Sequence, residues 1–408
     1  MNRQHAILVL NAGSSSLKFA LFAAAGGPPS RLARGRIEDI GAAARMRVFD
    51  SDGARTVDQA VRADDHEQAM ALLLDWVDRQ PAGGDLVAAG HRVVHGGSRF
   101  GQPVRIDAGV MEDLQSLTPL APLHMPHNLA AIEALRQANP ALPQVACFDT
   151  AFHRSMPLNE QRYALPHQWF DRGIRRYGFH GLSYEYIASV LPEYLGTDPG
   201  RRVVVAHLGH GASLCALRDG RSVATTMGFT PLDGIPMATR PGQLDPGVVT
   251  YLIREAGLPV AEVDDLLNHH SGLAGLSGGS GDMRELLDDA RPQAAEAVDY
   301  FVHHTGRAIA SLAAALGGLD ALVFTAGIGE NAPAIRERVC RQAAWLGIEL
   351  DAGANERNDT RISAPGSRVS VWRIATDEEA VIARHTRAQL DGDHHPVSQG
   401  EHDDTPRG

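Results

Sequence analysis

Cysteine is scarce in this sequence of 408 residues, and its three cysteines, Cys147, Cys215 and Cys340, lie far apart. No two of them have the spacing of a metal-binding or redox motif, and they do not form the pattern of a disulfide framework. The sequence also lacks an apolar run of the roughly 20 residues that span a membrane. Its first residues do not have the character of a signal peptide. These absences predict a soluble protein of the reducing cytoplasm that has no membrane partner.

A surplus of positive charge is missing as well. The chain has 38 Lys and Arg against 49 Asp and Glu, which gives a formal net charge of -11. Because nucleic-acid binding depends on neutralising phosphates, this balance argues against a nucleic-acid partner. A small anionic substrate stays compatible with it, since such a site needs only a local basic group. The length and the 44% hydrophobic content allow a large core in two or three domains.

Short apolar segments alternate with longer helical patterns, which is typical of an α/β fold. Strands are expected at residues 7–10, 17–22, 145–148, 203–206, 213–217, 322–325 and 369–374. Asp245, Pro246 and Gly257 supply a cap, a first-turn proline and a glycine stop for one helix. A long alanine-rich helix is expected over residues 292–316. The tail from Asp391 lacks hydrophobic periodicity and is expected to be disordered.

Two segments share one pattern, in which glycine and serine connect a pair of apolar runs. Residues 7–22 contain NAGSSS between two strands, and residues 203–217 contain HLGHGAS between two strands. Lys18 lies inside the second predicted strand, so the first segment is not a P-loop. Backbone N–H groups and hydroxyls in such a hairpin suit phosphate oxygens, with Lys18 as a point charge. The alternatives are a serine-rich hairpin without a ligand and a chance similarity; a shared origin would predict duplicated domains around a cleft.

Two further glycine-rich segments are candidates for contact with a ligand. Residues 321–331 predict a strand, a glycine turn with Gly327 and Gly329, and then a helix whose amino end favours anions. This segment lacks the dinucleotide-binding fingerprint, and a plain turn is the alternative. Residues 272–282 are expected to form a flexible loop that ends at an acid and a base, Asp282 and Arg284.

Basic residues lie beside small or aromatic residues in segments 91–97, 177–181 and 237–242. One such histidine or arginine is more often a structural hydrogen-bond donor than a catalyst. Together with the phosphate-binding candidates, two arginines and a histidine favour phosphoryl transfer, which depends on positioning and on charge stabilisation.

Carboxylates end two of the predicted elements. Asp149 follows a strand, the usual place of a functional carboxylate in an open α/β sheet. Glu378 lies at an expected helix start, where capping explains it equally well. With Asn11, these oxygens could hold Mg²⁺ through waters.

Taken together, these residues resemble the acetate/propionate kinase family of the sugar-kinase/Hsp70/actin superfamily. The matching segments run from Asn11 to Glu379 and leave out little besides the tail. They are NAGSSSLKF, HRVVHGG, LAPLHMPHN, FDTAFH, YGFHGLS, HLGHGAS, DGIPMATRPG, GIGEN and TDEE. Each is moderately specific, and their number and order make the resemblance strong.

The resemblance implies reversible phosphoryl transfer from ATP to acetate, giving acetyl phosphate and ADP, with Mg²⁺ and possible use of Mn²⁺. It implies a metal site at Asn11 and Glu378, and catalytic roles for Asp149, His180 and Arg240. Arg92 would bind the carboxylate. A small apolar pocket for the methyl group would consist of Val94, Leu123, Phe179 and Pro231. The nucleotide site would comprise Lys18, His207, Leu208, Gly209, His210, Gly211, Asp282, Met283, Arg284, Gly327, Ile328, Gly329, Glu330 and Asn331.

The fold that the resemblance implies is α/β, with two actin-like, ribonuclease H-like domains and a nucleotide cleft between them. The first is expected over residues 1–150 plus about 380–390, the second over residues 151–379, and residues 391–408 form the tail. A homodimer is implied in the same way. One departure concerns His210, which replaces the Asn of many relatives and whose donor capacity varies with pH.

Two rival functions differ from acetate phosphorylation. A kinase for propionate, butyrate or a sugar is one; a sugar kinase needs an aspartate base for a hydroxyl but not the arginine pair. An actin-like ATP-binding protein is the other, and it has no use for a carboxylate-binding arginine. Acetate is already ionised at neutral pH, so we expect Asp149 to act through a cation or through the arginines rather than as a base.

Overall fold

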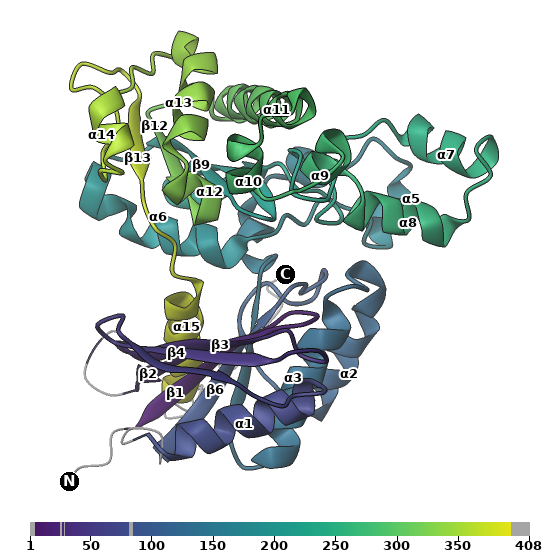
Figure 1. Ribbon diagram of the computed structural model, residues 1–408, viewed down its shortest axis with the longest axis vertical. Coiled ribbons are helices and arrows are strands. Elements are labelled where there is room, and N and C mark those ends of the chain that lie inside the picture. The colour runs from purple at the N-terminus through teal and green to yellow at the C-terminus, as the bar shows by residue number, and fades with distance from the viewer. Residues whose placement is uncertain (1–4, 25–26, 28, 81–84, 393–408) are drawn as a thin grey trace, which may run out of the picture.

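The structure is a computed structural model that describes residues 5–24, 27, 29–80 and 85–392. Two β-sheets organise it, and Figure 1 shows one lobe built on each. The first sheet has the strand order β5-β4-β3-β2-β1-β6-β8-β7 and the second the order β11-β10-β9-β12-β13. The strands are β1 Ala6–Ala12, β2 Leu17–Ala23, β3 Arg31–Glu38, β4 Arg45–Asp50, β5 Arg55–Ala60, β6 Leu86–Val93, β7 Val104–Arg105, β8 Gln144–Phe148, β9 Arg202–Leu208, β10 Ala212–Arg218, β11 Arg221–Thr225, β12 Ala321–Thr325 and β13 Ser370–Arg373.

The two sheets contain the same five-strand unit. In β3-β2-β1-β6-β8 and in β11-β10-β9-β12-β13, three strands pair antiparallel and two more follow in parallel. Each unit begins with one of the two glycine–serine hairpins, β1–β2 or β9–β10. The two hairpins therefore occupy the same position in two units of equal topology, which is consistent with the predicted duplication.

Helices cover both faces of the first sheet because β1 alternates between two cores. Leu8 and Leu10 are buried in a cluster with residues of α1 and α3 (His66–Asp78 and Met125–Ala138). Ile7 and Val9 are buried in another cluster, with residues of α15 (Glu378–Gly392). A strand that is apolar on both faces needs a helix layer on each. The last helix of the chain therefore packs on the first sheet (Figure 1).

The second sheet lies between α11 and α6 (Pro292–Leu316 and Gly181–Leu195). Helices α5, α7 and α8 (His167–Asp171, Pro246–Arg254 and Val260–His269) extend to one side of this lobe (Figure 1). The other helices are α2 Ala108–Ser116, α4 Leu158–Gln161, α9 Gly272–Ser277, α10 Met283–Asp288, α12 Ala326–Asn331, α13 Pro333–Gln342 and α14 Ala352–Glu356, with short 3₁₀ turns at Thr118–Leu120, Ala151–Ser155 and Ala344–Leu346. Of the helices described, none is both long and apolar enough to cross a membrane.

The strands expected from the sequence are all present, and the helix over Pro292–Leu316 has the predicted bounds. Two predictions were wrong. The expected loop over residues 272–282 begins with helix α9, and the glycine turn after β12 is itself the short helix α12. Helix α15 continues to Gly392, beyond the predicted start of the tail at Asp391, and residues 393–408 lie outside the described residues.

Candidate active site

Three polar side chains meet at the carboxyl ends of β1, β6 and β8. Arg92 is the centre of this group: its Nε donates to Asp149 Oδ1 at 3.1 Å and its Nη1 to Asn11 Oδ1 at 3.2 Å. Its Nη2 also forms an ion pair with Asp149 Oδ2. Adjacent parallel strands end at the same edge of a sheet, so residues far apart in the sequence meet there.

Glu378, the first residue of α15, adds a second carboxyl group to this cluster. Burial raises the pKa of Glu378 to about 7, as do the charges of Asp149 and Glu379, while those of Arg92 and Lys18 oppose the rise. Burial alone lowers the pKa of Arg92, but Asp149 and Glu378 raise it above its ordinary value. The guanidinium therefore stays charged between two acids.

Oxygen donors for a cation are present here. The described residues contain no cluster of three or more His, Cys, Asp or Glu side chains arranged for a metal. Asn11 and Glu378 nevertheless offer amide and carboxylate oxygens, the ligands that Mg²⁺ prefers, and Mg²⁺ keeps several waters. Burial is the largest cause of the raised pKa of Glu378, and a cation bound at its carboxylate would oppose that rise. This donor set fits a divalent cation held by few protein oxygens.

Two stacked histidines face these groups from the second lobe. The rings of His180 and His207 lie 4.1 Å apart between centroids, with planes 17° apart. His180 Nδ1 contacts Ser213 Oγ at 2.9 Å, and His207 Nδ1 contacts Ser183 Oγ at 2.8 Å. Burial, and then the charges of neighbouring groups, lowers the pKa of both, to about 3 for His207. Both imidazoles are therefore neutral at pH 7.

His180 has a strained backbone, because its φ of 57° is unusual for a residue other than glycine. Strain of this kind is tolerated where the surrounding structure holds a functional side chain in place. The charges of both Arg92 and Arg240 lower the pKa of His180, so it lies within electrostatic reach of both arginines.

Arg240 carries a positive charge without a carboxylate partner in the part of the chain that the structure describes. Its Nη1 donates to the carbonyl of Pro231 at 2.9 Å. Burial lowers the pKa of Arg240 to about 10, which leaves it protonated at pH 7. A half-buried guanidinium without a carboxylate partner is a strong site for an anion. Gly211 lies against it, since a Cβ there would be 2.8 Å from Arg240 Nη2 and 3.3 Å from His180 Nε2.

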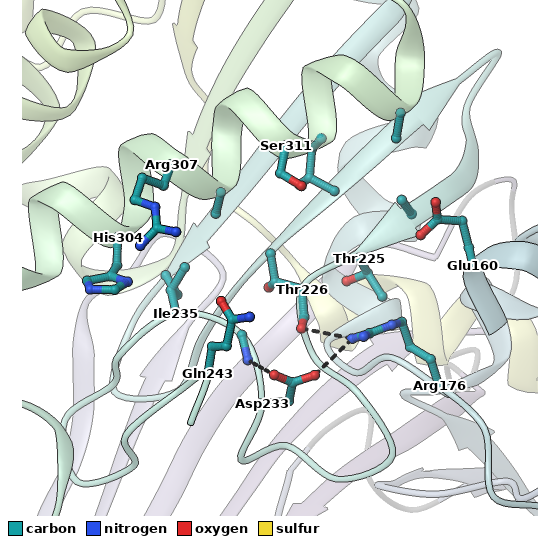
Figure 2. A pocket seen from close by; sticks show the side chains of 15 residues that line it. Glu160, Arg176, Thr225, Thr226, Asp233, Ile235, Gln243, His304, Arg307 and Ser311 are labelled. Carbon is teal, nitrogen blue, oxygen red and sulfur yellow. Dashed lines mark hydrogen bonds and ion pairs between the residues drawn. The ribbon is translucent and has the colours of Figure 1, made fainter. Parts of the chain in front are cut away.

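Hydrogen bonds from Arg176 stabilise the loop that carries Pro231 and Arg240. Arg176 Nη1 donates to the carbonyl of Thr226 and to Asp233 Oδ2, each at 3.1 Å, as Figure 2 shows. A cavity of about 500 Å³ borders this loop and α11, and none of the residues predicted for the site lines it. The sequence provided no indication of this cavity.

A second cavity, of about 310 Å³, contains most of the predicted nucleotide residues. It is lined by Gly209, His210, Gly281, Asp282, Met283, Arg284, Gly327, Ile328, Asn331 and Ala332. These residues come from the β9–β10 hairpin, the start of α10 and the region of α12. Its polar and apolar lining is typical of a small-molecule site.

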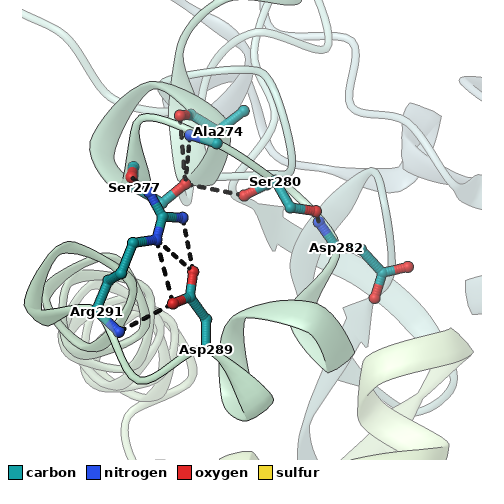
Figure 3. A network of polar contacts seen from close by, with 7 residues as sticks. Ala274, Ser277, Ser280, Asp282, Asp289 and Arg291 are labelled. Carbon is teal, nitrogen blue, oxygen red and sulfur yellow. Dashed lines mark hydrogen bonds and ion pairs between the residues drawn. The ribbon is translucent and has the colours of Figure 1, made fainter.

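Hydrogen bonds shape the segment before α10 (Figure 3). Ser277 Oγ accepts from the N–H of Gly279 at 3.2 Å and donates to the carbonyl of Ser280 at 3.0 Å. Asp282 caps α10 by accepting from the N–H of Arg284 at 2.8 Å, and it also pairs with the Arg284 side chain. The hydrogen bonds of this side chain and backbone lower the pKa of Asp282 to about 2.

Several predicted nucleotide residues do not line this cavity. Leu208 is fully buried in the core. Glu330 turns inward, because its Oε1 accepts from the N–H of Ala326 at 2.8 Å, and the carbonyl of Gly329 accepts from Arg336. Lys18 lies opposite Asn11 in the β1–β2 hairpin, and its charge lowers the pKa of Glu378, so it lies near that carboxyl group. His207 and Gly211 lie beside His180.

The residues predicted for the apolar pocket differ in their exposure. Val94 and Phe179 are 3% and 2% exposed, and Pro231 lies next to Arg240 through its carbonyl. Leu123 is 38% exposed, so it does not form a buried wall in this conformation.

The sequence reasoning missed His124 and Asn128, although both belong to the recognised segment LAPLHMPHN. Burial, and then the charges of Arg92, Arg240 and His127, lowers the pKa of His124 to about 4, so this histidine borders the cleft. Asn128 is buried and contacts the ends of two strands. The segment LAPLHMPHN, which contains both residues, could have indicated them as candidates from the sequence.

Known proteins resemble this chain along almost its whole length. Residues 6–384 match the model of the acetokinase family. The acetate kinase of Rhodopseudomonas palustris (strain ATCC BAA-98 / CGA009) is 52% identical over 392 residues, with 95% of this chain and 98% of the relative covered. A crystal structure of Porphyromonas gingivalis acetate kinase has a TM-score of 0.85 at 37% identity, covering 95% of this chain and all of that one. A propionate kinase from Francisella tularensis has a TM-score of 0.89 at 38% identity, covering 94% and 99%. The protein therefore belongs to the acetokinase family.

Proposed function

We propose that the protein transfers the γ-phosphoryl group of ATP to acetate, giving acetyl phosphate and ADP, and that the reaction is reversible. The observation that carries this proposal is the pair of arginines across the cleft. Arg92 is held by Asp149, while the half-buried Arg240 has no carboxylate partner among the described residues. A carboxylate and a transferring phosphoryl group are the two anions that such an arrangement suits.

Each side chain has a separate role in this transfer. Arg92 binds the acetate carboxylate, and Asp149 orients Arg92 through two of its nitrogen atoms. Arg240 and the neutral His180 stabilise the charge of the phosphoryl group as it passes in line between donor and acceptor oxygens. Acetate attacks as an anion, so the reaction requires no general base.

Asn11 and Glu378 would hold Mg²⁺, which supplies positive charge beside the phosphates when it is bound. The β9–β10 hairpin, the start of α10 and α12 would hold ATP in the cavity that they line. Closure of the two lobes would exclude water, which otherwise competes with acetate as the acceptor.

The test is acetate-dependent formation of ADP, with acetyl phosphate trapped as the hydroxamate. We expect both products in equal amounts, and R92L should lose the dependence on acetate. ATP binding without acetate-dependent ADP would favour an actin-like binding protein instead.

Propionate is the second candidate substrate, supported by the similarity to a propionate kinase. One methylene group is worth only about 1–3 kcal/mol of discrimination, so both acids are expected to react. Turnover on acetate, propionate and butyrate decides between them.

We also propose a homodimer that acts in the cytoplasm. Helices α7 and α8, which extend to one side of the second lobe, expose large apolar side chains, and Tyr251 and Val260 have exposed fractions of 61% and 68%. Exposed apolar surface of this kind is typical of subunit contacts. Light scattering at micromolar concentration measures the oligomeric state.

A further inference from the structure

β1 and β6 separate where they reach the site. Their parallel pairing ends at Leu10 and His91. Beyond that point β1 continues to Ala12 only beside β2, and β6 continues to Val93 only beside β8. At Asn11 and Arg92, the next residues along, the two strands are therefore no longer paired with each other.

The side chain of Asn128 fills this opening. Its Oδ1 accepts from the N–H of Val94 at 3.0 Å, and its Nδ2 donates to the carbonyl of Ala12 at 2.9 Å. A side-chain amide carries the same donor and acceptor as a peptide group. It thus takes the place of the missing ladder hydrogen bonds while the strands stay apart.

Both hydrogen bonds of the Asn128 side chain go to strand ends rather than to its own helix. Asn128 lies in the first turns of α3 and is 4% exposed, among buried apolar residues of that helix. A buried amide is costly unless its donor and acceptor are both paired. Both are paired here, and both partners belong to segments that carry site residues: Ala12 follows Asn11, and Val94 lies two residues after Arg92.

We infer that Asn128 is a positioning residue of the acceptor half of the site. It sets the gap between β1 and β6, and so the distance at which Arg92 meets Asn11 and at which Val94 borders the methyl group. The inference rests on the proposed function for its kinetic consequence, but its geometric claim is independent of substrate. The nucleotide half of the site lies in the other lobe and has no bond to Asn128.

The test compares N128D and N128L with Q144L as the matched control. Asp keeps the acceptor and loses the donor, while Leu loses both at similar size. Gln144 is also a buried amide of this sheet, 5% exposed, but its side chain bonds to His91. We expect kcat/KM for acetate to fall roughly 10- to 100-fold in both Asn128 variants, as for other supporting residues of reactive groups. KM for ATP should change less than about twofold, and N128D should keep more activity than N128L. Q144L should lose thermal stability, but its kcat/KM for acetate should not fall selectively relative to its KM for ATP.

Equal rises of KM for acetate and ATP, or wild-type kcat/KM for acetate in folded variants, would overturn the inference. Crystal structures of the two variants provide a readout that does not depend on activity. We expect Arg92 Nη1 to leave hydrogen-bond distance of Asn11 Oδ1; an unchanged separation of 3.2 Å would refute the positioning role. Wild-type protein without acetate-dependent ADP would refute the proposed function alone, because the structural comparison would still decide the role of Asn128.

Discussion

Replacing Asp149 by Asn tests whether this carboxylate acts through Arg92. Asp149 accepts from two nitrogens of Arg92, and their side chains are 2% and 21% exposed. Asn keeps one acceptor oxygen but turns an NH₂ group toward a guanidinium N–H and removes the counter-charge. Its volume is nearly the same, so packing is preserved.

The magnitude follows from this burial. Removing one partner of a fully buried ion pair costs about 3–5 kcal/mol. Because a fifth of the Arg92 side chain stays exposed, we expect a loss of about 2–3 kcal/mol in the free energy of unfolding. If the same energy is lost from transition-state stabilisation, kcat/KM for acetate falls about 30- to 150-fold.

The assay is hydroxamate formation at several acetate concentrations, together with urea unfolding of the same preparations. D320N is the matched control. Asp320 forms a two-point ion pair with Arg202, with Nη2–Oδ1 at 2.5 Å and Nε–Oδ2 at 3.0 Å. The pair lies at the amino ends of β9 and β12, away from the strand ends that carry the site residues. We expect D320N to keep kcat/KM within about twofold, because its pair is remote from Arg92 and the two side chains are 35% and 37% exposed. If D149N were as active as D320N, the reasoning about Arg92 would be wrong.

Three further predictions concern the pocket, the glycine beside Arg240 and the buried histidines. V94A should raise the ratio of kcat/KM for propionate to that for acetate by about tenfold, because it widens the wall of the methyl pocket; an unchanged ratio would exclude Val94 from this wall. G211A should lower kcat at least about tenfold with little change in the thermal midpoint, because its Cβ would displace Arg240 and His180; wild-type kcat would contradict that contact. The free energy of unfolding should fall by about 1 kcal/mol per buried histidine between pH 6.5 and 5.5. Burial lowers the pKa of these groups in the folded state, so the unfolded chain binds more protons, and their contribution is full above about pH 6.5 and declines as the pH falls. Urea unfolding at both pH values measures this loss, and an equal free energy of unfolding at the two pH values would mean that the imidazoles are not held neutral. The histidines concerned are His91, His95, His153, His180 and His207.

Helical structure in the glycine-rich segments shows where local patterns misled. Residues 272–282 and 326–331 contain many glycines, which disfavour helices in isolation. In the structure, Gly272 lies against the backbone of Met237 and Arg240, where a Cβ would come within 2.2 Å of the carbonyl of Met237. Tertiary packing selects glycine there and outweighs propensity.

Local sequence alone determined the apolar strands, the two hairpins, the long helix and the positions of Asn11, Asp149 and Glu378 at element ends, because these depend on neighbours a few residues apart. Tertiary structure alone decided that β1 and β6 separate beside Asn128, that Arg240 has no carboxylate partner among the described residues, and that Glu330 and Leu208 turn away from the 310 Å³ cavity. Distant partners take part in these arrangements: Asn128 and Ala12 are 116 positions apart, and Glu330 Oε1 also accepts from the N–H of Thr376, 46 positions away. No local pattern records which distant donor or charge a side chain will meet, and that meeting sets its burial, its pKa and its role.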